Sequence, residues 1–154
     1  MKKLFYVMIM ALTLSAGMVL ASCGNDNDEP DAPKTQNLQS AYENENDTHF
    51  MFDINLEKDS SSIYLYNVQF AIGEQLSPVM NIRIDAPVTV DKSGKVYTYA
   101  GTNIIPYMLR GNNPVPVPNL PVTDLICTVN VNNKTYSMSF DCHGGHYDNS
   151  GKLQ

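Results

Sequence analysis

The chain has 154 residues, with 10 Lys and Arg against 16 Asp and Glu, which gives a formal net charge of −6. Proteins that bind nucleic acid meet the phosphates with clustered lysine and arginine. Here the basic residues are scattered along the sequence, so nucleic acid is excluded as an expected partner.

The first 22 residues are predicted to be a lipoprotein signal peptide. Two lysines follow Met1, an apolar run covers residues 4–20, and the run ends in Leu20-Ala21-Ser22-Cys23. The signal peptidase needs small residues before the cysteine, whose thiol accepts the diacylglycerol. A transmembrane helix is the less favoured alternative, because about 17 apolar residues are marginal for a ~30 Å hydrocarbon core. We therefore predict lipidation at Cys23, which makes the membrane a partner through acyl chains.

Residues 23–47 are predicted to be the lipidated cysteine followed by a disordered acidic tether. Apart from Lys34, the charged residues here are all acidic: Asp26, Asp28, Glu29, Asp31, Glu43, Glu45 and Asp47. A segment this acidic and this poor in apolar residues buries too little surface to offset its chain entropy.

From residue 48 to residue 154 the sequence predicts one antiparallel β domain, because apolar residues recur with period two. One face is predicted to carry Phe50, Phe52, Ile54 and Leu56, and a second strand to carry Tyr64, Tyr66, Val68, Phe70 and Ile72 on one face. Further strands are predicted at residues 80–84, 88–90 and 97–99, the last two joined by a hairpin connection at 91–95. Four prolines in residues 111–121 predict a loop or polyproline stretch, because proline lacks the donor that a central strand needs.

The last hairpin can be predicted residue by residue. Asn132-Asn133 suit a two-residue turn, because asparagine tolerates positive φ. This register pairs Cys127 with Met138. The predicted core face is then Leu125, Cys127, Val129 and Val131 opposite Phe140, Met138, Tyr136 and Lys134, while Thr128, Asn130, Ser137 and Ser139 face outward. In total we expect about six to eight short strands.

The same register bears on Cys127 and Cys142. It places Cys142 opposite Thr123, four residues from Cys127, which is about 13 Å at ~3.3 Å per residue. A disulfide needs Cα atoms within about 7 Å. Two buried free thiols are therefore favoured, and a disulfide remains the alternative if a bulge or a longer turn changes the register.

No catalytic, cofactor or metal site is predicted, and we do not expect an enzyme. The segment Cys142-His143-Gly144-Gly145-His146 holds ligand-type residues, but its spacing matches no closed zinc pattern. Its glycines are predicted to form a turn between the last strands. The Gly-x-Ser-x-Gly signature of serine hydrolases does not occur in the sequence.

Two tyrosine pairs, Tyr64/Tyr66 and Tyr97/Tyr99, are the candidate ligand-binding residues. Each pair is spaced by two and so shares one strand face. Tyrosine favours strands and buries its ring well, so both pairs are interpreted first as core aromatics. The functional alternative is a stacking or cavity-lining surface for a glycan or an apolar ligand.

The N-terminal region resembles Bacteroidetes surface lipoproteins. The resemblance rests on Lys2-Lys3, on the Leu20-Ala21-Ser22-Cys23 box with Gly24 after it, and on the acidic run over residues 25–31. In those lipoproteins the acidic run directs export to the outer face of the outer membrane. The resemblance therefore implies a lipid-anchored outer-membrane protein exposed at the cell surface.

The body of the chain is similar to the lipocalin-like (calycin-like) β-barrel lipoproteins of the same bacteria. The similarity rests on strand rhythm in Ile63-Tyr64-Leu65-Tyr66-Asn67-Val68-Gln69-Phe70, Met80-Asn81-Ile82-Arg83-Ile84, Asp91-Lys92-Ser93-Gly94-Lys95-Val96-Tyr97-Thr98-Tyr99 and Tyr136-Ser137-Met138-Ser139-Phe140. It implies an all-β, small antiparallel calycin-like barrel that binds an apolar small molecule or a glycan. The alternative is an immunoglobulin-like β-sandwich that acts as a structural or adhesive module without a small-molecule ligand.

Replacing the predicted lipidated cysteine should abolish membrane anchoring. We expect Cys23→Ala to lose the acyl mass, because no other thiol follows a lipobox, whereas Cys127→Ala should keep it. Intact-mass measurement of membrane-extracted protein checks both variants. An acylated Cys23→Ala chain would show that the lipid is attached elsewhere.

Overall fold

The computed structural model describes residues 33–41 and 47–154. The predicted signal peptide, Cys23 and most of the predicted tether lie outside these residues. Within the described ranges every regular element is a β-strand, so the prediction of an all-β antiparallel domain is confirmed. No helix in this part of the chain has the length and apolar character to cross a membrane.

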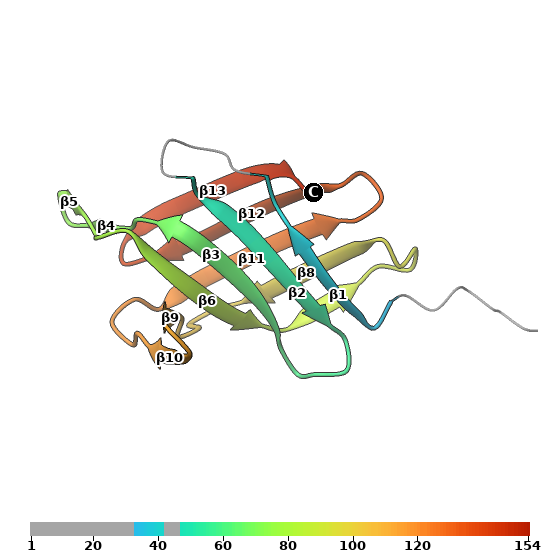
Figure 1. Ribbon diagram of the computed structural model, residues 1–154, viewed down its shortest axis with the longest axis horizontal. Coiled ribbons are helices and arrows are strands. Elements are labelled where there is room, and N and C mark those ends of the chain that lie inside the picture. Colours follow the sequence, from blue (N-terminus) through green and yellow to red (C-terminus); the bar gives the residue numbers. More distant parts are fainter. Residues whose placement is uncertain (1–32, 42–46) are drawn as a thin grey trace, which may run out of the picture.

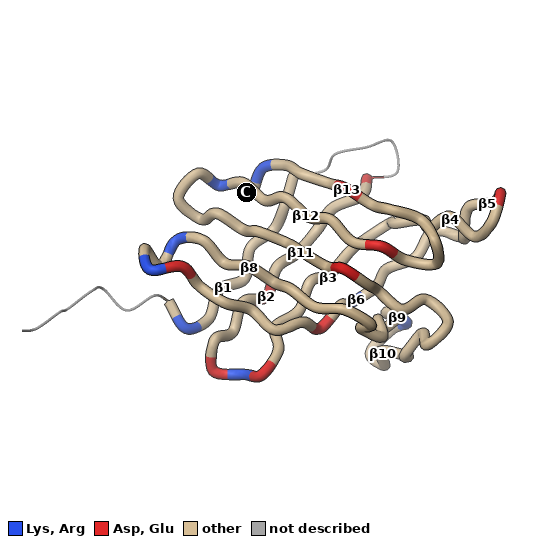
Figure 2. The backbone as a smooth tube through the Cα atoms, turned by 180° about the vertical axis from the view of Figure 1, so that it is seen from behind, with Lys and Arg blue, Asp and Glu red and all other residues tan. Residues whose placement is uncertain are grey.

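Two antiparallel sheets make up the domain (Figure 1 and, from behind, Figure 2). The six-stranded sheet has the order β1 (Thr35–Gln39), β2 (His49–Asn55), β3 (Ser61–Val68), β6 (Met80–Ala86), β9 (Tyr107–Arg110) and β10 (Asn113–Pro116). The five-stranded sheet has the order β13 (Gly145–Lys152), β12 (Thr135–Cys142), β11 (Val122–Asn130), β8 (Val96–Gly101) and β7 (Val88–Val90). A small hairpin, β4 (Ala71–Ile72) and β5 (Gln75–Leu76), projects from one end.

The chain passes between the two sheets three times, from β6 to β7, from β8 to β9 and from β10 to β11. β6 leads into β7 through Pro87, whose carbonyl accepts a hydrogen bond from the Ala100 amide at 3.2 Å. Ser40, next to the end of the edge strand β1, forms a bridge with Leu153, which follows the edge strand β13. None of the described sheets closes on itself to form a barrel.

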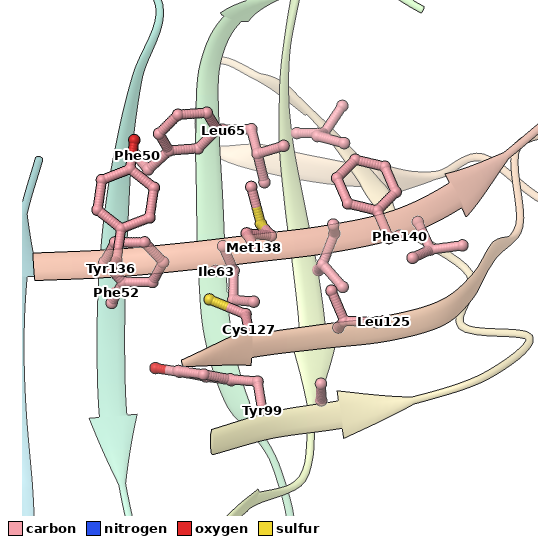
Figure 3. Packing of buried hydrophobic residues seen from close by; sticks show 14 of the residues in the cluster. Phe50, Phe52, Ile63, Leu65, Tyr99, Leu125, Cys127, Tyr136, Met138 and Phe140 are labelled. Carbon is pink, nitrogen blue, oxygen red and sulfur yellow. The ribbon is translucent and has the colours of Figure 1, made fainter. Parts of the chain in front are cut away.

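The hydrophobic core lies between the two sheets, and Figure 3 shows side chains of both layers meeting there. Phe52, Ile63 and Ile84 of one sheet and Tyr99 and Val129 of the other are fully buried. Burying a large apolar side chain contributes about 1.5–3 kcal/mol, so these rows supply most of the driving force for folding.

The register predicted for the last hairpin is confirmed from Ile126 to Asn130, with Cys127 paired to Met138. The predicted core face is buried except at the turn, where Val131 is half-buried and Lys134 is exposed. The predicted two-residue turn is wrong: residues 131–134 form the turn, and the positive φ (53°) falls on Lys134 rather than on either asparagine. Asn130 explains this, because its side-chain oxygen accepts the amides of residues 132 and 133 at 3.0 Å and fixes a wider turn.

The prediction of one continuous face from Tyr64 to Ile72 is also wrong. The pairing of β3 with β6 is irregular between Leu65 and Val68, and Asn67 there has a φ of 56°. This bulge adds one residue and turns the strand over. As a result Tyr64 and Tyr66 face outward and are half-buried, whereas Val68 and Phe70 enter the core.

Four segments without predicted strand bounds belong to the two large sheets, and β9 is one of them. Residues 35–39, placed in the disordered tether, form β1, because Leu38 packs on the core and backbone pairing with β2 outweighs the polar composition. The proline-rich segment contributes β10, which lies at a sheet edge where proline is tolerated. The predicted glycine turn implied a strand after it, but the bounds of β13 could not be predicted because it lacks an apolar alternation.

Cys127 and Cys142 are both buried and free, as predicted. A bulge in β11 pairs Cys142 with Val122, five positions from Cys127 along the strand. The Cys142 thiol donates to the Leu120 carbonyl at 3.7 Å. Burial raises the pKa of both thiols above the usual value, which favours the thiol form of each over the thiolate.

Truncating the core face of the last hairpin should cost far more stability than truncating its outer face. We expect Phe140→Ala to lower the unfolding free energy by about 3–5 kcal/mol and Ser139→Ala to lower it by less than about 0.5 kcal/mol. Urea denaturation measures both. Equal costs would mean that the hairpin register differs from the one described.

Both thiols should resist labelling in the folded protein, because burial disfavours the reactive thiolate. With Cys23→Ala as background, we expect slow modification in native buffer and two labels per chain after unfolding without reductant. A mass spectrum without labels in the unfolded, unreduced chain would reveal a disulfide instead.

Candidate functional site

A cavity of about 260 Å³ lies between the two sheets at the end that carries the β4–β5 hairpin, and we call it the end cavity. Its walls come from β2, from the end of β3 and from the paired strands β12 and β13. The lining residues are Thr48, Phe50, Leu65, Asn67, Val68, Gln69, Phe70, Leu76, Met138, Phe140, Tyr147, Asp148 and Asn149.

The floor of the end cavity is apolar and its rim is polar. Phe50, Leu65, Met138 and Phe140 are nearly fully buried in the same core that Figure 3 shows. One side-chain amide at the rim is already hydrogen-bonded within the protein: Gln69 Nε2 donates to the Ser77 carbonyl at 2.9 Å. Small-molecule sites commonly combine an apolar wall with a few polar groups that orient the ligand.

The β4–β5 hairpin is fixed beside the end cavity by contacts to β13. The Ala71 amide donates to the Tyr147 hydroxyl at 2.7 Å. The Phe70 ring lies 5.3 Å from the Tyr147 ring, edge to face, and Tyr147 stacks on Phe140 at the same centroid distance. Aromatic pairs in this geometry add stabilisation beyond their buried area. Leu76 of the hairpin remains 67% exposed at the lip.

Glycine at position 145 is required for this arrangement. A Cβ added there would lie 2.8 Å from the Tyr147 hydroxyl oxygen, so a side chain would displace the ring. Gly144 has a φ of 82° in the turn before it, together with His143 at 49°. The prediction of a turn between the last strands is confirmed for Gly144, whereas Gly145 is the first residue of β13.

Next to the rim, His146 lies between two carboxylates. Its Nδ1 contacts Asp141 Oδ1, and its Nε2 lies 3.1 Å from Asp148 Oδ2. The hydrogen bond to Asp141, followed by the charge of Asp148, raises the pKa of His146 above its ordinary value of about 6.5. An imidazole ring donates from both nitrogens only when it is protonated, so this geometry suits the imidazolium form.

Tyr97 and Tyr99, one of the two candidate pairs, lie in the core and are fully buried. The Tyr97 hydroxyl accepts a hydrogen bond from Gln36 Nε2 at 2.7 Å, and the Tyr99 hydroxyl donates to the Asp53 carbonyl at 3.1 Å. Burial raises the pKa of Tyr99 far above the usual range. These contacts give both side chains a structural role.

Tyr64 and Tyr66, the other pair, lie on the outer face of the six-stranded sheet, so the structure does not bring the four tyrosines together. Tyr66 stacks on His49 with ring centroids 4.5 Å apart, and Tyr64 lies 6.3 Å from Tyr66 in a nearly parallel plane. Arg83 of the neighbouring strand lies 4.7 Å from the Tyr107 ring centroid. The outer face is thus aromatic and half-exposed.

The residues that shape the end cavity were not singled out from the sequence. Phe70 and Leu76 follow the Asn67 bulge, which no period-two pattern reveals, and Tyr147 lies in β13, whose bounds were not predicted. The available signal was local: Gly73-Glu74 between short apolar segments suits a tight hairpin. In residues 33–41 and 47–154 no group of three or more His, Cys, Asp or Glu is placed to hold a metal ion.

Comparison of the chain with protein-family models, with curated proteins and with solved structures found no match.

Removing the Tyr147 hydroxyl should loosen the β4–β5 hairpin. In Tyr147→Phe the Ala71 amide loses its acceptor, which should cost about 1–3 kcal/mol locally and speed amide exchange at residues 71–76. Tyr64→Phe is the matched control on the outer face and should leave that exchange unchanged. Hydrogen exchange measured by NMR compares the two. Unchanged protection in Tyr147→Phe would show that the hairpin does not depend on this bond.

Proposed function

We propose that this protein is a lipid-anchored lipoprotein of the bacterial outer membrane, exposed at the cell surface, whose β domain binds a small apolar molecule in the end cavity. The N-terminal processing signal and the acidic run after Cys23 support the location. The binding activity is supported by the end cavity. No catalytic residues are proposed, and the protein acts as a binder rather than an enzyme.

The observation that carries the binding proposal is an apolar floor reachable from solvent. Phe50, Leu65, Met138 and Phe140 offer buried carbon surface, and the cavity of about 260 Å³ lies just under the range of about 300–1,000 Å³ found for drug-sized ligands. A ligand of about 6–12 non-hydrogen atoms therefore suits it, since larger molecules would extend past the Leu76 lip.

For the architecture we propose two packed sheets, close to an immunoglobulin-like β-sandwich. The calycin-like barrel is the other candidate. Support for two layers comes from the separate strand orders of the two sheets. Two features would also occur in a flattened barrel. The chain runs directly from β6 into β7, and Ser40 forms a bridge with Leu153. Either arrangement leaves the end cavity between the layers.

A glycan on the outer face is a second candidate ligand. It is favoured by the half-exposed rings of Tyr64 and Tyr66, because sugar rings stack on aromatic side chains. Titration with N-acetylglucosamine oligomers separates the candidates, since this site predicts shifts at Tyr64 and Tyr66 and the end cavity predicts none there.

The end cavity can be tested with hexan-1-ol as a neutral probe. The mature chain from residue 23 is used with Cys23→Ala, so that no attached acyl chain competes. We expect saturable NMR shifts at Leu65, Met138 and Phe140. Shifts confined to exposed apolar residues such as Val115 and Ile126 would contradict the proposal.

Two exposed apolar residues give a matched pair of variants for this test. Leu76→Ser removes apolar surface at the lip and should weaken hexan-1-ol binding about twofold to fivefold. Val79 is 53% exposed but does not line the end cavity, so Val79→Ser should leave the affinity unchanged. Equal effects of the two variants would mean that the alcohol binds outside the end cavity.

A further inference from the structure

The charges around the end cavity are acidic. Among the described residues that line it, Asp148 is the one that carries a charge at neutral pH, and its side chain is 71% exposed. Neither lysine nor arginine lines the cavity. A carboxylate at the mouth without a lining cation attracts cationic groups and repels anionic ones.

The surroundings of Asp148 strengthen this bias. Asp141, His146 and Asp148 form a cluster whose net charge is −1 when His146 is protonated and −2 when it is neutral. Glu74 lies exposed in the turn of the β4–β5 hairpin on the same end of the molecule. Figure 2 shows acidic positions along β12 and β13 and at this hairpin, with most basic positions at the opposite end.

The aromatic rings that line the end cavity add a second attraction for cations. Phe50, Phe70, Phe140 and Tyr147 place aromatic rings around one small volume. Ring faces attract ammonium groups, most strongly where water is partly excluded. The same rings accept the methylene or aromatic part of a ligand, so one molecule can satisfy the floor and the rim together.

We propose that the ligand of the end cavity is a small organic cation, with an apolar chain or ring between the sheets and an ammonium group at Asp148. The inference rests on the proposed function, because it names the ligand class of the same site. It excludes fatty acids and other apolar anions as preferred ligands.

Three probes with a common six-carbon chain test the ligand class: hexylammonium, hexan-1-ol and heptanoate, each titrated by NMR into the mature Cys23→Ala chain. Exposed ion pairs contribute about 0.2–1 kcal/mol, so we expect hexylammonium to bind up to about fivefold more tightly than the alcohol. Heptanoate should bind most weakly. The preference should fade in 0.5 M salt, because screening weakens exposed charge pairs.

Two isosteric variants locate the charge that selects the cation. Asp148→Asn should remove most of the preference for hexylammonium over hexan-1-ol. Asp59→Asn removes the same charge from the β2–β3 connection, at the opposite ends of these strands from the end cavity, and should retain the preference. Both residues are exposed, so neither change should affect folding.

The pH dependence provides a readout that general apolar binding would not show. The charged groups against the His146 ring are Asp141 from β12 and Asp148 from its own strand. As pH rises through the raised pKa of His146, the ring loses its proton and the cluster becomes more negative. Hexylammonium keeps its charge up to about pH 10, so its affinity should rise with pH, and His146→Gln should flatten that rise.

The outcomes separate the two proposals. If none of the three probes shifts the NMR signals of Leu65, Met138 or Phe140, the proposed binding function is wrong, and the proposed ligand class is then wrong as well. If all three bind with equal affinity, the end cavity binds apolar molecules but the inference of a cationic ligand is overturned. A preference for heptanoate, or a hexylammonium preference that survives Asp148→Asn, also overturns it.

Discussion

The structure depends on the burial of two strand faces against each other, which requires each strand to keep alternate side chains on one side. Two bulges reset this alternation, and each has an L-residue at positive φ: Asn67 at 56° and Asp124 at 51°. Without the extra residue in β11, Val122 and Leu125 could not both face the core, as their near-complete burial requires.

The end cavity follows from the bulge at Asn67. Pairing of β3 with β6 is interrupted there, and the chain leaves the sheet and crosses toward β13, where the Ala71 amide meets the Tyr147 hydroxyl. The side chain of Phe70 enters the gap between the layers, but it does not fill it. A space with an apolar floor therefore remains beside a hairpin whose Leu76 stays exposed.

The parts of the fold that follow from simple periodicity could be predicted, and those set by single residues could not. The register around Cys127 and Met138 was predictable because both strands alternate without interruption there. The bulge at Asn67 could not be seen, because nothing in the apolar pattern distinguishes one added residue from continued alternation. The residues of the end cavity share that origin, so the tyrosines chosen from strand pattern lie elsewhere.

β13, whose extent the apolar pattern could not predict, is also the strand that gives the site its chemistry. β13 lies at a sheet edge, and its alternation turns Tyr147 and Asn149 toward β12 and the core while His146 and Asp148 stay exposed. Asn149 is held by the Tyr136 hydroxyl at 2.6 Å, which fixes the strand against the core. An edge strand needs polar side chains to avoid unwanted pairing. The polar composition of β13 therefore gives no apolar alternation, and it also places the Asp148 carboxylate beside the aromatic rings of the end cavity.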